Sequence, residues 1–324
     1  MATIGKHRSQ RPPVRYPAAQ ERARDKRLDT EQARKFLGVS PEVFDTEIRT
    51  RASLPEADDS YAYHDLVAVA LDWGLPHSVP ELGLRVMMRF ADQSLDGMLA
   101  PTSWSFRLSL TEADTTGEGE LVLRDPTSAR MVLHGEYQRT DTGDGWLLPQ
   151  DQPVVVEGTL ETRGEDGGLL NPPLAQLYDQ VIEAFHHDQV RFQWITPAGR
   201  DAYASTWSSG RADCVVIARM ATDMLQQHGM KVRTQWGRVL GLLDAQHVWI
   251  DVLDSDHRWK RFDPLLQLHS ERLWGTHDSR GGFFRGGTPN ALPGWPGNTS
   301  MLVRRTAEDQ QDLFPVFSAR RVTV

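Results

Sequence analysis

The sequence predicts an α+β protein, because helical and strand-like hydrophobic patterns occupy different stretches of the chain. Apolar residues recur at helical spacing over 28–98 and again from Leu174 to about Val190. Apolar and polar residues alternate over 99–165 and around 247–263, as they do in half-buried strands. Separate runs of helices and of strands are typical of the α+β class.

The bulk composition is that of an ordinary globular protein. The chain has 324 residues, of which 39% are hydrophobic and 25% charged, and its formal net charge is −8. This charge does not favour nucleic-acid binding by the protein as a whole. Because no apolar run approaches the length of a membrane span, no membrane association is expected. The single cysteine excludes an internal disulfide and, since no apolar signal segment is visible, a cytoplasmic location is expected.

The first 27 residues are predicted to form a flexible basic arm. Residues 1–27 contain eight Lys or Arg residues, two acidic residues and little apolar content. Such a composition cannot bury enough apolar surface to fold by itself. A solvated tail is the simplest interpretation, and an arm that contacts an acidic partner is the alternative.

A small helical domain is predicted over 28–98. Thr30 is the expected N-cap of its first helix, and Ser40 followed by Pro41 is expected to begin a second. A third helix is expected from Tyr63 to Trp73.

Part of this domain, residues 28–74, resembles the helix-turn-helix of MerR-like and excisionase-like DNA-binding proteins. The segment contains ten acidic and four basic residues, whereas phosphate binding requires the opposite sign. A docking or packing domain is therefore favoured over a DNA-binding domain. DNA remains as a partner only through the basic arm, residues 1–27.

Short strands separated by turn-rich segments are predicted over 99–165. They indicate a small antiparallel sheet or sandwich with no readable function of its own. Residues 163–173 are predicted to link it to a catalytic domain over 170–324, which includes a C-terminal extension. In that extension, a final helix is expected after Asn298 or Thr299.

Cys214 is predicted to begin a helix, with Asp213 as its N-cap and Gly229 as its stop signal. At a helix N-terminus, the dipole and the unpaired backbone N–H groups favour a thiolate and can stabilise an oxyanion. A lone cysteine is otherwise usually a small buried hydrophobe. The predicted position therefore makes Cys214 a candidate nucleophile.

His247 and Asp263 are expected on the two strands of one hairpin. Folding the hairpin symmetrically about Ser255 places residue 247 opposite residue 263 on one face. A carboxylate there can orient the imidazole and stabilise its protonated form. With Cys214 on a helix packed against this sheet, the three residues give the nucleophile, base and orienter that acyl transfer needs.

The sequence "HVWIDV" and the later "RWKRFDP", following a cysteine at a helix start, resemble the transglutaminase-like superfamily over about residues 175–270. The resemblance implies a papain-like core in which the nucleophile helix packs on an antiparallel sheet. It also implies that Cys214 is the nucleophile, His247 the general base and acid, and Asp263 the orienter. The family often has Gly two residues before the cysteine, where this chain has Ala212.

Four further residues are candidates for the oxyanion site or for substrate contacts, although packing is the more common role of such side chains. They are Gln193, Trp194, Trp207 and Trp249. No cofactor and no metal ion is expected.

The sequence thus predicts cysteine-dependent acyl transfer through a Cys214 thioester. The acyl donor would be a peptide, a protein or a small molecule, and the acceptor an amine. The first alternative is a cysteine protease or amidase, which passes the acyl group to water. The second is a helix-turn-helix regulator or adaptor whose transglutaminase-like domain is catalytically silent.

Overall fold

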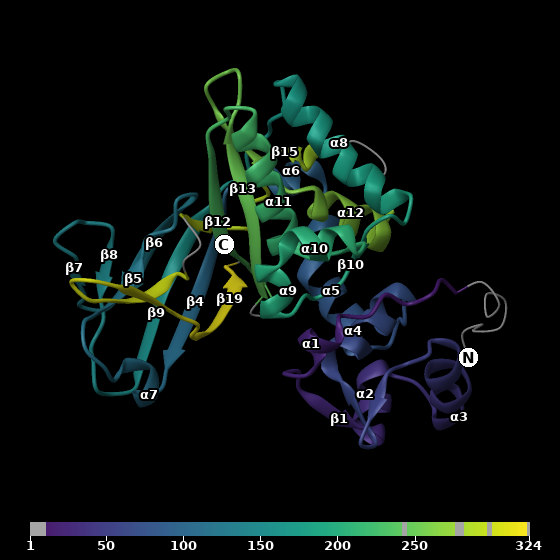
Figure 1. Ribbon diagram of the computed structural model, residues 1–324. Coiled ribbons are helices and arrows are strands. Elements are labelled where there is room, and N and C mark those ends of the chain that lie inside the picture. Colours follow the sequence, from purple (N-terminus) through teal and green to yellow (C-terminus); the bar gives the residue numbers. More distant parts are fainter. Residues whose placement is uncertain (1–10, 242–244, 276–281, 297–299, 323–324) are drawn as a thin grey trace. The chain divides into compact units, whose positions relative to one another are not determined.

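A computed structural model of the chain describes residues 11–241, 245–275, 282–296 and 300–322 (Figure 1). It divides into two compact units. The first unit comprises Met1–Arg85 and Ile182–Met220, and the second comprises Val86–Val181 and Ala221–Val324. The units therefore interleave along the chain, whereas the sequence suggested segments that follow one another.

The first unit contains a three-stranded antiparallel sheet, ordered β1-β3-β2, surrounded by helices. Its elements up to residue 87 are α1 (Ala19–Arg22), β1 (Arg27–Asp29), α2 (Thr30–Leu37), α3 (Pro41–Val43), the π-helix η1 (Phe44–Arg49), β2 (Glu56–Ala57), β3 (Ser60–Ala62), α4 (Tyr63–Asp72) and α5 (Val79–Met87), which runs into the second unit. Phe44, Tyr61 and Leu66 are fully buried in the core that these elements share.

Two of the helix starts can be compared with the predicted caps. The prediction of Thr30 was wrong by one residue, because the Asp29 side chain caps α2 by accepting a hydrogen bond of 2.8 Å from Gln32 N–H. Asp and Thr are both good caps, so the sequence alone did not separate these neighbours. The prediction of Ser40 is confirmed, since its hydroxyl accepts a hydrogen bond of 3.3 Å from the backbone N–H of Val43.

The predicted basic arm is only partly described, since residues 1–10 lie outside the described residues. The remainder, 11–27, packs on the first unit. The indole of Trp73 donates a hydrogen bond of 2.9 Å to the carbonyl of Pro12, and the Tyr16 hydroxyl donates one of 2.6 Å to a backbone carbonyl. These residues therefore differ from the freely moving arm that composition suggested.

The first unit also contains the chain that leads to Cys214. Its elements there are the end of α8 (Pro172–His186), β10 (Arg191–Phe192), α9 (Pro197–Asp201), α10 (Tyr203–Ser208), β11 (Arg211–Ala212) and the start of α11 (Cys214–Gln227). Strands β10 and β11 pair in parallel.

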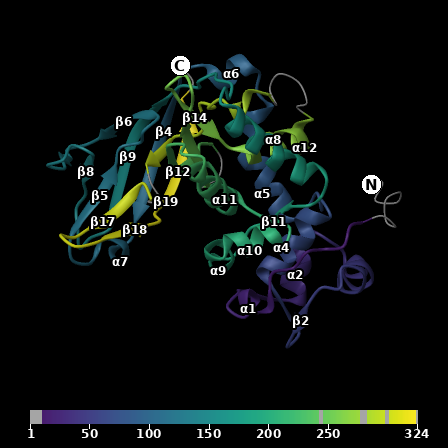
Figure 2. The ribbon, with the colours of Figure 1, turned by 45° about the horizontal axis from the view of Figure 1, so that its top comes forward.

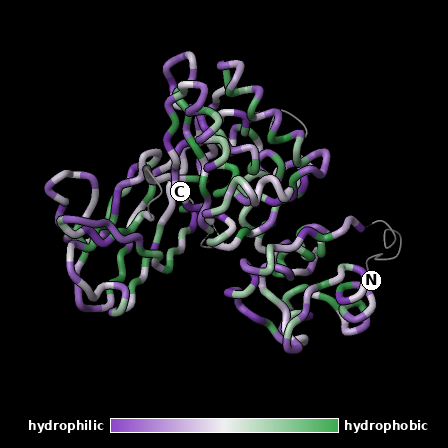
Figure 3. Tube along the Cα trace, in the orientation of Figure 1, coloured by the Kyte–Doolittle hydropathy of each residue, from purple (hydrophilic) through white to green (hydrophobic). Residues whose placement is uncertain are grey.

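In the second unit, two antiparallel sheets form a β-sandwich (Figures 1 and 2). One sheet has the order β18-β17-β5-β8-β7 and the other β19-β4-β9-β6. The strands are β4 (Thr102–Leu110), β5 (Glu120–Arg124), β6 (Ala129–His134), β7 (Gln138–Arg139), β8 (Gly145–Leu147), β9 (Val154–Thr162), β17 (Leu302–Arg305), β18 (Gln310–Leu313) and β19 (Val316–Arg321). Buried and exposed residues alternate along β9, while the turn between β7 and β8 is hydrophilic (Figure 3).

The C-terminal extension completes this sandwich, so the expected final helix was wrong. Strand β17 pairs with β5, and β19 pairs with β4. Along β19, the buried residues Phe317 and Ala319 alternate with exposed ones. Such short apolar runs are ambiguous between helix and strand, and here pairing with strands about 200 residues earlier decides the outcome.

The other sheet of the second unit has the order β15-β14-β13-β12-β16. Its strands are β12 (Val232–Val239), β13 (Ala245–Leu253), β14 (Trp259–Phe262), β15 (Arg285–Gly286) and β16 (Gly294–Pro296). Helix α12 (Pro264–Trp274) follows β14 directly, and Tyr178 of α8 packs edge-to-face on Phe262 of β14. Helices therefore cover one face of an antiparallel sheet, in agreement with the predicted α+β class (Figure 2).

Among the described residues, none of the helices combines the length and the hydropathy needed to cross a bilayer.

Asp65 gives the first unit a testable dependence on pH. This side chain is fully buried on α4, 3.3 Å from the guanidinium of Arg22. Burial raises the pKa of Asp65 from 3.8 to about 6, against the opposing charge of Arg22. Between these two values the folded chain binds a proton that the unfolded chain does not, so this group favours folding more as the pH falls from about 6 to about 4.

We therefore expect Asp65→Asn to change the pH dependence of the melting temperature. The difference, variant minus wild type, should be more positive at pH 8 than at pH 4, because the variant never buries a carboxylate charge. Asp58→Asn, at an exposed position of the same unit, is the control and should give the same difference at both pH values. A difference for Asp65→Asn that does not vary with pH would contradict the assignment.

Candidate active site

Cys214 is the first residue of α11, as predicted, and its side chain is half-buried. Asp213 caps the helix, because its carboxylate accepts a hydrogen bond of 3.0 Å from the backbone N–H of Val216. The cysteine thus lies at the N-terminus of α11, which is the positive end of the helix dipole.

Arg200, which lies on α9, supports this turn and was not predicted from the sequence. Its Nε donates a hydrogen bond of 2.7 Å to the buried carboxylate of Asp213. Although burial acts to lower the pKa of Arg200, the charges of Asp213 and Cys214 raise it above its ordinary value. Arg200 thus adds a positive charge beside the capped start of α11.

His247 and Asp263 form a buried hydrogen-bonded pair in the second unit. The distance from His247 Nε2 to Asp263 Oδ2 is 2.6 Å, and the two residues are 5% and 3% exposed. His247 lies on β13, and Asp263 lies between β14 and the first turn of α12. A carboxylate at Nε2 fixes the ring orientation and leaves proton exchange to Nδ1.

The register that brings this pair together differs from the predicted one. Leu253 pairs with Trp259 and Asp251 with Arg261, so the hairpin is centred on Asp256 and not on Ser255. The predicted register was therefore wrong by two residues. Because side chains alternate with a period of two, this shift leaves His247 and Asp263 on the same face, now as diagonal neighbours.

The longer turn explains the shift. Asp254 N–H donates to Arg258 (2.9 Å), and His257 N–H donates to Asp254 (3.0 Å), which closes a turn of five residues. His257 has a φ of 59°, which lies in the left-handed region. The buried Asp254 carboxylate also accepts hydrogen bonds of 2.7 and 2.8 Å from the N–H groups of Leu170 and Asn171, which fixes the start of α8 beside this turn.

Trp249 forms the surface on which His247 rests. The two rings stack with a centroid separation of 5.9 Å and an interplanar angle of 29°. The indole N–H of Trp249 also donates a hydrogen bond of 3.2 Å to the carboxylate of Asp251. The centroid of the Trp249 ring lies 4.0 Å from the guanidinium of Arg261. Trp249 therefore acts through His247 and the neighbouring charges, and its role here is one of positioning.

The position of the Trp249 indole requires glycine at two neighbouring positions of the sheet. Gly237 on β12 pairs directly with His247, and a Cβ at Gly237 would lie 2.2 Å from the Trp249 ring. Gly294 on β16 pairs with Gly237, and a Cβ there would lie 2.5 Å from the same ring. The two glycines thus form the flat surface that lets the indole reach across two strands.

The other three candidates lie in the first unit. Gln193 is 1% exposed, and its side-chain amide donates a hydrogen bond of 2.7 Å to the backbone carbonyl of Arg15. Trp194 lies against Gly83, and Trp207 packs edge-to-face near Phe185 at 6.4 Å. The amide of Gln193 is thus already used within the fold, and Trp207 makes a packing contact.

Two buried residues near the His247–Asp263 pair were not singled out by the sequence as site residues. Burial, with a further contribution from the charge of Asp263, raises the pKa of Tyr178 well above its ordinary value. Burial lowers the pKa of His269 well below its ordinary value, and the charges of Arg272 and His247 act in the same direction. Both side chains therefore stay neutral near pH 7.

The structure thus brings His247, Asp263 and Trp249 together in the second unit and places Cys214 with Asp213 and Arg200 in the first. Within the described residues, no cluster of three His, Cys, Asp or Glu side chains has the spacing of a metal site.

Residues 172–264 match a family model described as the transglutaminase-like superfamily. This part of the chain is therefore a transglutaminase-like domain, and the resemblance seen over about 175–270 is confirmed. The match covers less than a third of the chain and includes Cys214, His247 and Asp263.

Comparison with solved structures gives two distant similarities. One is a proposed cysteine protease from Cytophaga hutchinsonii, with 9% identity, a TM-score of 0.29, and coverage of 69% of this chain and 89% of that one. The other is the periplasmic domain of TgpA from Pseudomonas aeruginosa, with 13% identity, a TM-score of 0.24, and coverage of 58% and 93%. Neither similarity is close enough to support a conclusion about this chain. No curated protein matches it.

We expect Gly237→Ala to displace Trp249 and to lower the free energy of unfolding by about 1–3 kcal/mol, because the added methyl group overpacks the sheet. Gly168→Ala is the matched control, since a Cβ at Gly168 meets nothing within 4 Å, and it should change stability by less than about 0.5 kcal/mol. Urea titration followed by tryptophan fluorescence measures both. Equal stability of the two variants would show that the indole does not lie on Gly237.

Proposed function

We propose that this chain is a cysteine enzyme that forms a thioester at Cys214 and transfers the acyl group to an amine. The observation that carries the proposal is the buried hydrogen bond of 2.6 Å between His247 and Asp263, inside a domain that matches the transglutaminase-like superfamily. A buried carboxylate on an imidazole suits acid–base chemistry, because it stabilises the protonated ring that forms during the reaction.

In the proposed first step, His247 Nδ1 accepts the thiol proton while Cys214 Sγ bonds to the carbonyl carbon of the donor. The N–H groups at the start of α11 are suited to stabilise the oxyanion. His247 then returns the proton to the leaving group as the bond between that group and the carbonyl carbon breaks. Asp263 stabilises the imidazolium throughout.

In the second step, an amine attacks the thioester carbon and gives its proton to His247. The S–C bond breaks, the amide leaves, and the proton returns to Cys214. Water in place of the amine would make the same residues a protease or an amidase. The proposed donor is a peptide, a protein or a small molecule with an amide or activated acyl group.

Intact mass after incubation with p-nitrophenyl acetate tests the first step. Wild-type protein should gain one acetyl group and release p-nitrophenolate, and Cys214→Ala should do neither, because the chain has a single cysteine. His247→Ala should lower the rate of acylation by about 10²–10⁴-fold. Acetylation of Cys214→Ala at the wild-type rate would refute the proposal. Absence of any adduct on the folded wild type would favour a catalytically silent domain.

The fate of the acyl group is measured with methylamine present in water. Transfer predicts that methylacetamide forms and that its yield rises with the amine concentration. Formation of acetate alone, at a rate that methylamine does not change, would assign the domain to the hydrolytic alternative.

Asp263→Asn should slow acylation by at least about tenfold, yet less than His247→Ala, because Asn keeps a hydrogen-bond partner for the ring and loses the charge. Asp256→Asn, an exposed residue of the hairpin turn, is the control and should react like the wild type. The rate of p-nitrophenolate release at pH 7 compares the two. A rate for Asp263→Asn equal to that of the control would contradict the orienting role.

A further inference from the structure

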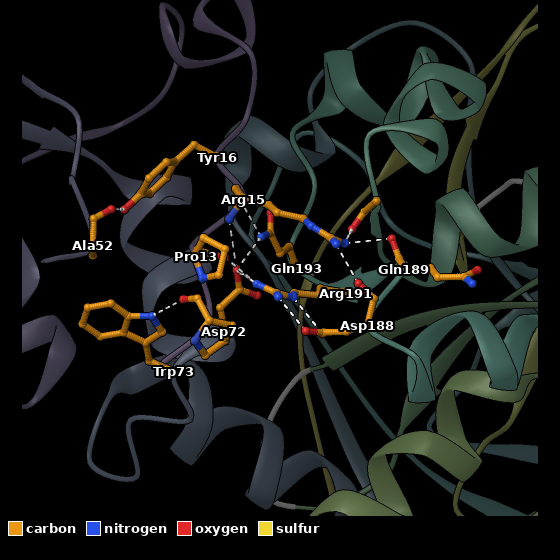
Figure 4. A network of polar contacts seen from close by, with 12 residues as sticks. Pro13, Arg15, Tyr16, Ala52, Asp72, Trp73, Asp188, Gln189, Arg191 and Gln193 are labelled. Atoms are coloured by element: carbon orange, nitrogen blue, oxygen red, sulfur yellow. Dashed lines mark hydrogen bonds and ion pairs between the residues drawn. The ribbon is translucent and has the colours of Figure 1, made fainter. Parts of the chain in front are cut away.

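The chain just before Cys214 is held by the N-terminal segment, residues 11–27, within the first unit. Arg15 lies at the centre of these contacts, near Asp72, Gln189 and Gln193 (Figure 4). Its backbone N–H donates a hydrogen bond of 3.2 Å to the carboxylate of Asp72, and its backbone carbonyl accepts one of 2.7 Å from the side chain of Gln193.

The guanidinium of Arg15 binds three backbone carbonyls. Nη2 donates to Asp188 (2.6 Å), while Nη1 donates to Gln189 (2.8 Å) and to Gly210 (2.7 Å). The first two carbonyls belong to the turn between α8 and β10. The third belongs to the residue before β11, so one side chain joins the starts of both parallel strands.

Gly210 connects the contacts of Arg15 to the stretch of chain that leads to Cys214. Its carbonyl also accepts the N–H of Arg191 at 2.9 Å, the first hydrogen bond of the β10–β11 pair. With a φ of +78°, it adopts a backbone conformation that other residues rarely adopt, and a Cβ there would lie 2.4 Å from Arg15 Nη1. The close approach of Arg15 therefore requires glycine at this position.

A second contact holds the same stretch of chain. Arg211, which is 3% exposed, donates a hydrogen bond of 3.1 Å to the carboxylate of Glu21. The other carboxylate oxygen of Glu21 accepts one of 3.3 Å from Thr196. Gly210 and Arg211, shortly before Cys214, are thus both bound by the N-terminal segment.

The contacts of Arg15 are supported by a buried acid at the end of α4, in the helical part of this unit. Asp72 is 1% exposed as a side chain, and its Oδ2 accepts hydrogen bonds from Arg15 (3.2 Å), Arg191 (3.5 Å) and Gln193 (3.5 Å). A carboxylate shared by three donors is costly to move, because each donor would lose its partner inside the protein.

The stretch 208–212, which leads to Cys214, contributes little apolar packing. Its sequence is Ser-Ser-Gly-Arg-Ala, which contains no large apolar side chain. Its position therefore rests on polar contacts, and the loss of a few of them should loosen it locally without unfolding the unit. Ala212 ends β11, Asp213 caps α11 and Cys214 follows. A displacement of the Gly210 backbone should therefore also displace the thiol, which lies four residues later in the chain.

We propose that Arg15 is a positioning residue for Cys214, acting through the Gly210 carbonyl and the β10–β11 pair to hold the thiol at the start of α11. This inference rests on the proposed function, because it matters only if Cys214 reacts. It gives the N-terminal segment a role in the active site that its basic composition does not suggest.

The test uses the full chain and the rate of alkylation by iodoacetamide, which reports on Cys214 alone because the chain has one cysteine. For Arg15→Ala, the rate at pH 6.5 should fall by about 10–100-fold, since the thiolate is no longer held at the helix terminus. Above about pH 9.5 the variant and the wild type should converge, because an ordinary thiol is then largely ionised.

Two further measurements separate positioning from a general loss of stability. Ethylguanidinium added to Arg15→Ala should restore part of the lost rate at pH 6.5, by occupying the place of the missing group. Arg24→Ala is the matched control, an exposed arginine of the same segment, and should react like the wild type with or without the additive. If Arg15→Ala does not fold, Arg15→Lys decides, because lysine keeps the charge but cannot bind three carbonyls in one plane, and it should be slowed at pH 6.5.

Wild-type reactivity at pH 6.5 in Arg15→Ala, or in Arg15→Lys if only that variant folds, overturns the inference and leaves the proposed function intact. A pH profile lowered equally at all pH values, with no rescue, also overturns it. If the wild type itself reacts no faster at pH 6.5 than a free cysteine, the proposed function fails, and the inference fails with it.

Discussion

The hydrogen bond between His247 and Asp263 depends on one constraint, the register of the hairpin that carries them. A shift of one residue between β13 and β14 would move one of the two side chains to the opposite face. The observed register differs from the symmetrical one by two residues, and the pair survives because the pleat repeats every two. The turn that sets this register is fixed by Asp254, whose carboxylate also binds the start of α8.

The nucleophile depends on a different set of contacts, which are polar and distant in sequence. The capped start of α11 is a local feature, since Asp213 precedes Cys214 directly. The turn before it is held by Arg15 and Asp72, which lie far away in the chain. The helical part of the first unit contributes Asp72 to these contacts. The role of the helix-turn-helix resemblance over 28–74 stays a prediction.

What could be predicted from the sequence follows from the range of the interactions involved. Asp213, Ser40 and the helix at Cys214 were predicted because caps and helix starts depend on neighbouring residues. The strands of the C-terminal extension were missed because their partners, β4 and β5, lie about 200 residues earlier. Arg15 was read as part of a mobile arm for the same reason, since composition does not show which carbonyls a guanidinium will bind. Likewise, Gly237 gave no signal, because its role is to leave room for Trp249.

Buried cations connect these observations. Arg211 and Arg261 are each 3% exposed, and burial lowers the pKa of Arg261 although the charges of Asp251 and Asp263 oppose this. Well-packed apolar residues often stabilise a fold as much as a buried ion pair does, so such groups are weak evidence for stability. They do fix direction, because a planar guanidinium bonds or stacks in few geometries. The guanidinium of Arg261 lies over the Trp249 ring, and this ring stacks on His247. Burial of Arg261 therefore helps to orient the His247 imidazole. In the first unit, the buried Arg211 and the half-buried Arg15 restrict the chain before Cys214 in the same way, so orientation, rather than added stability, is the common result of these cations.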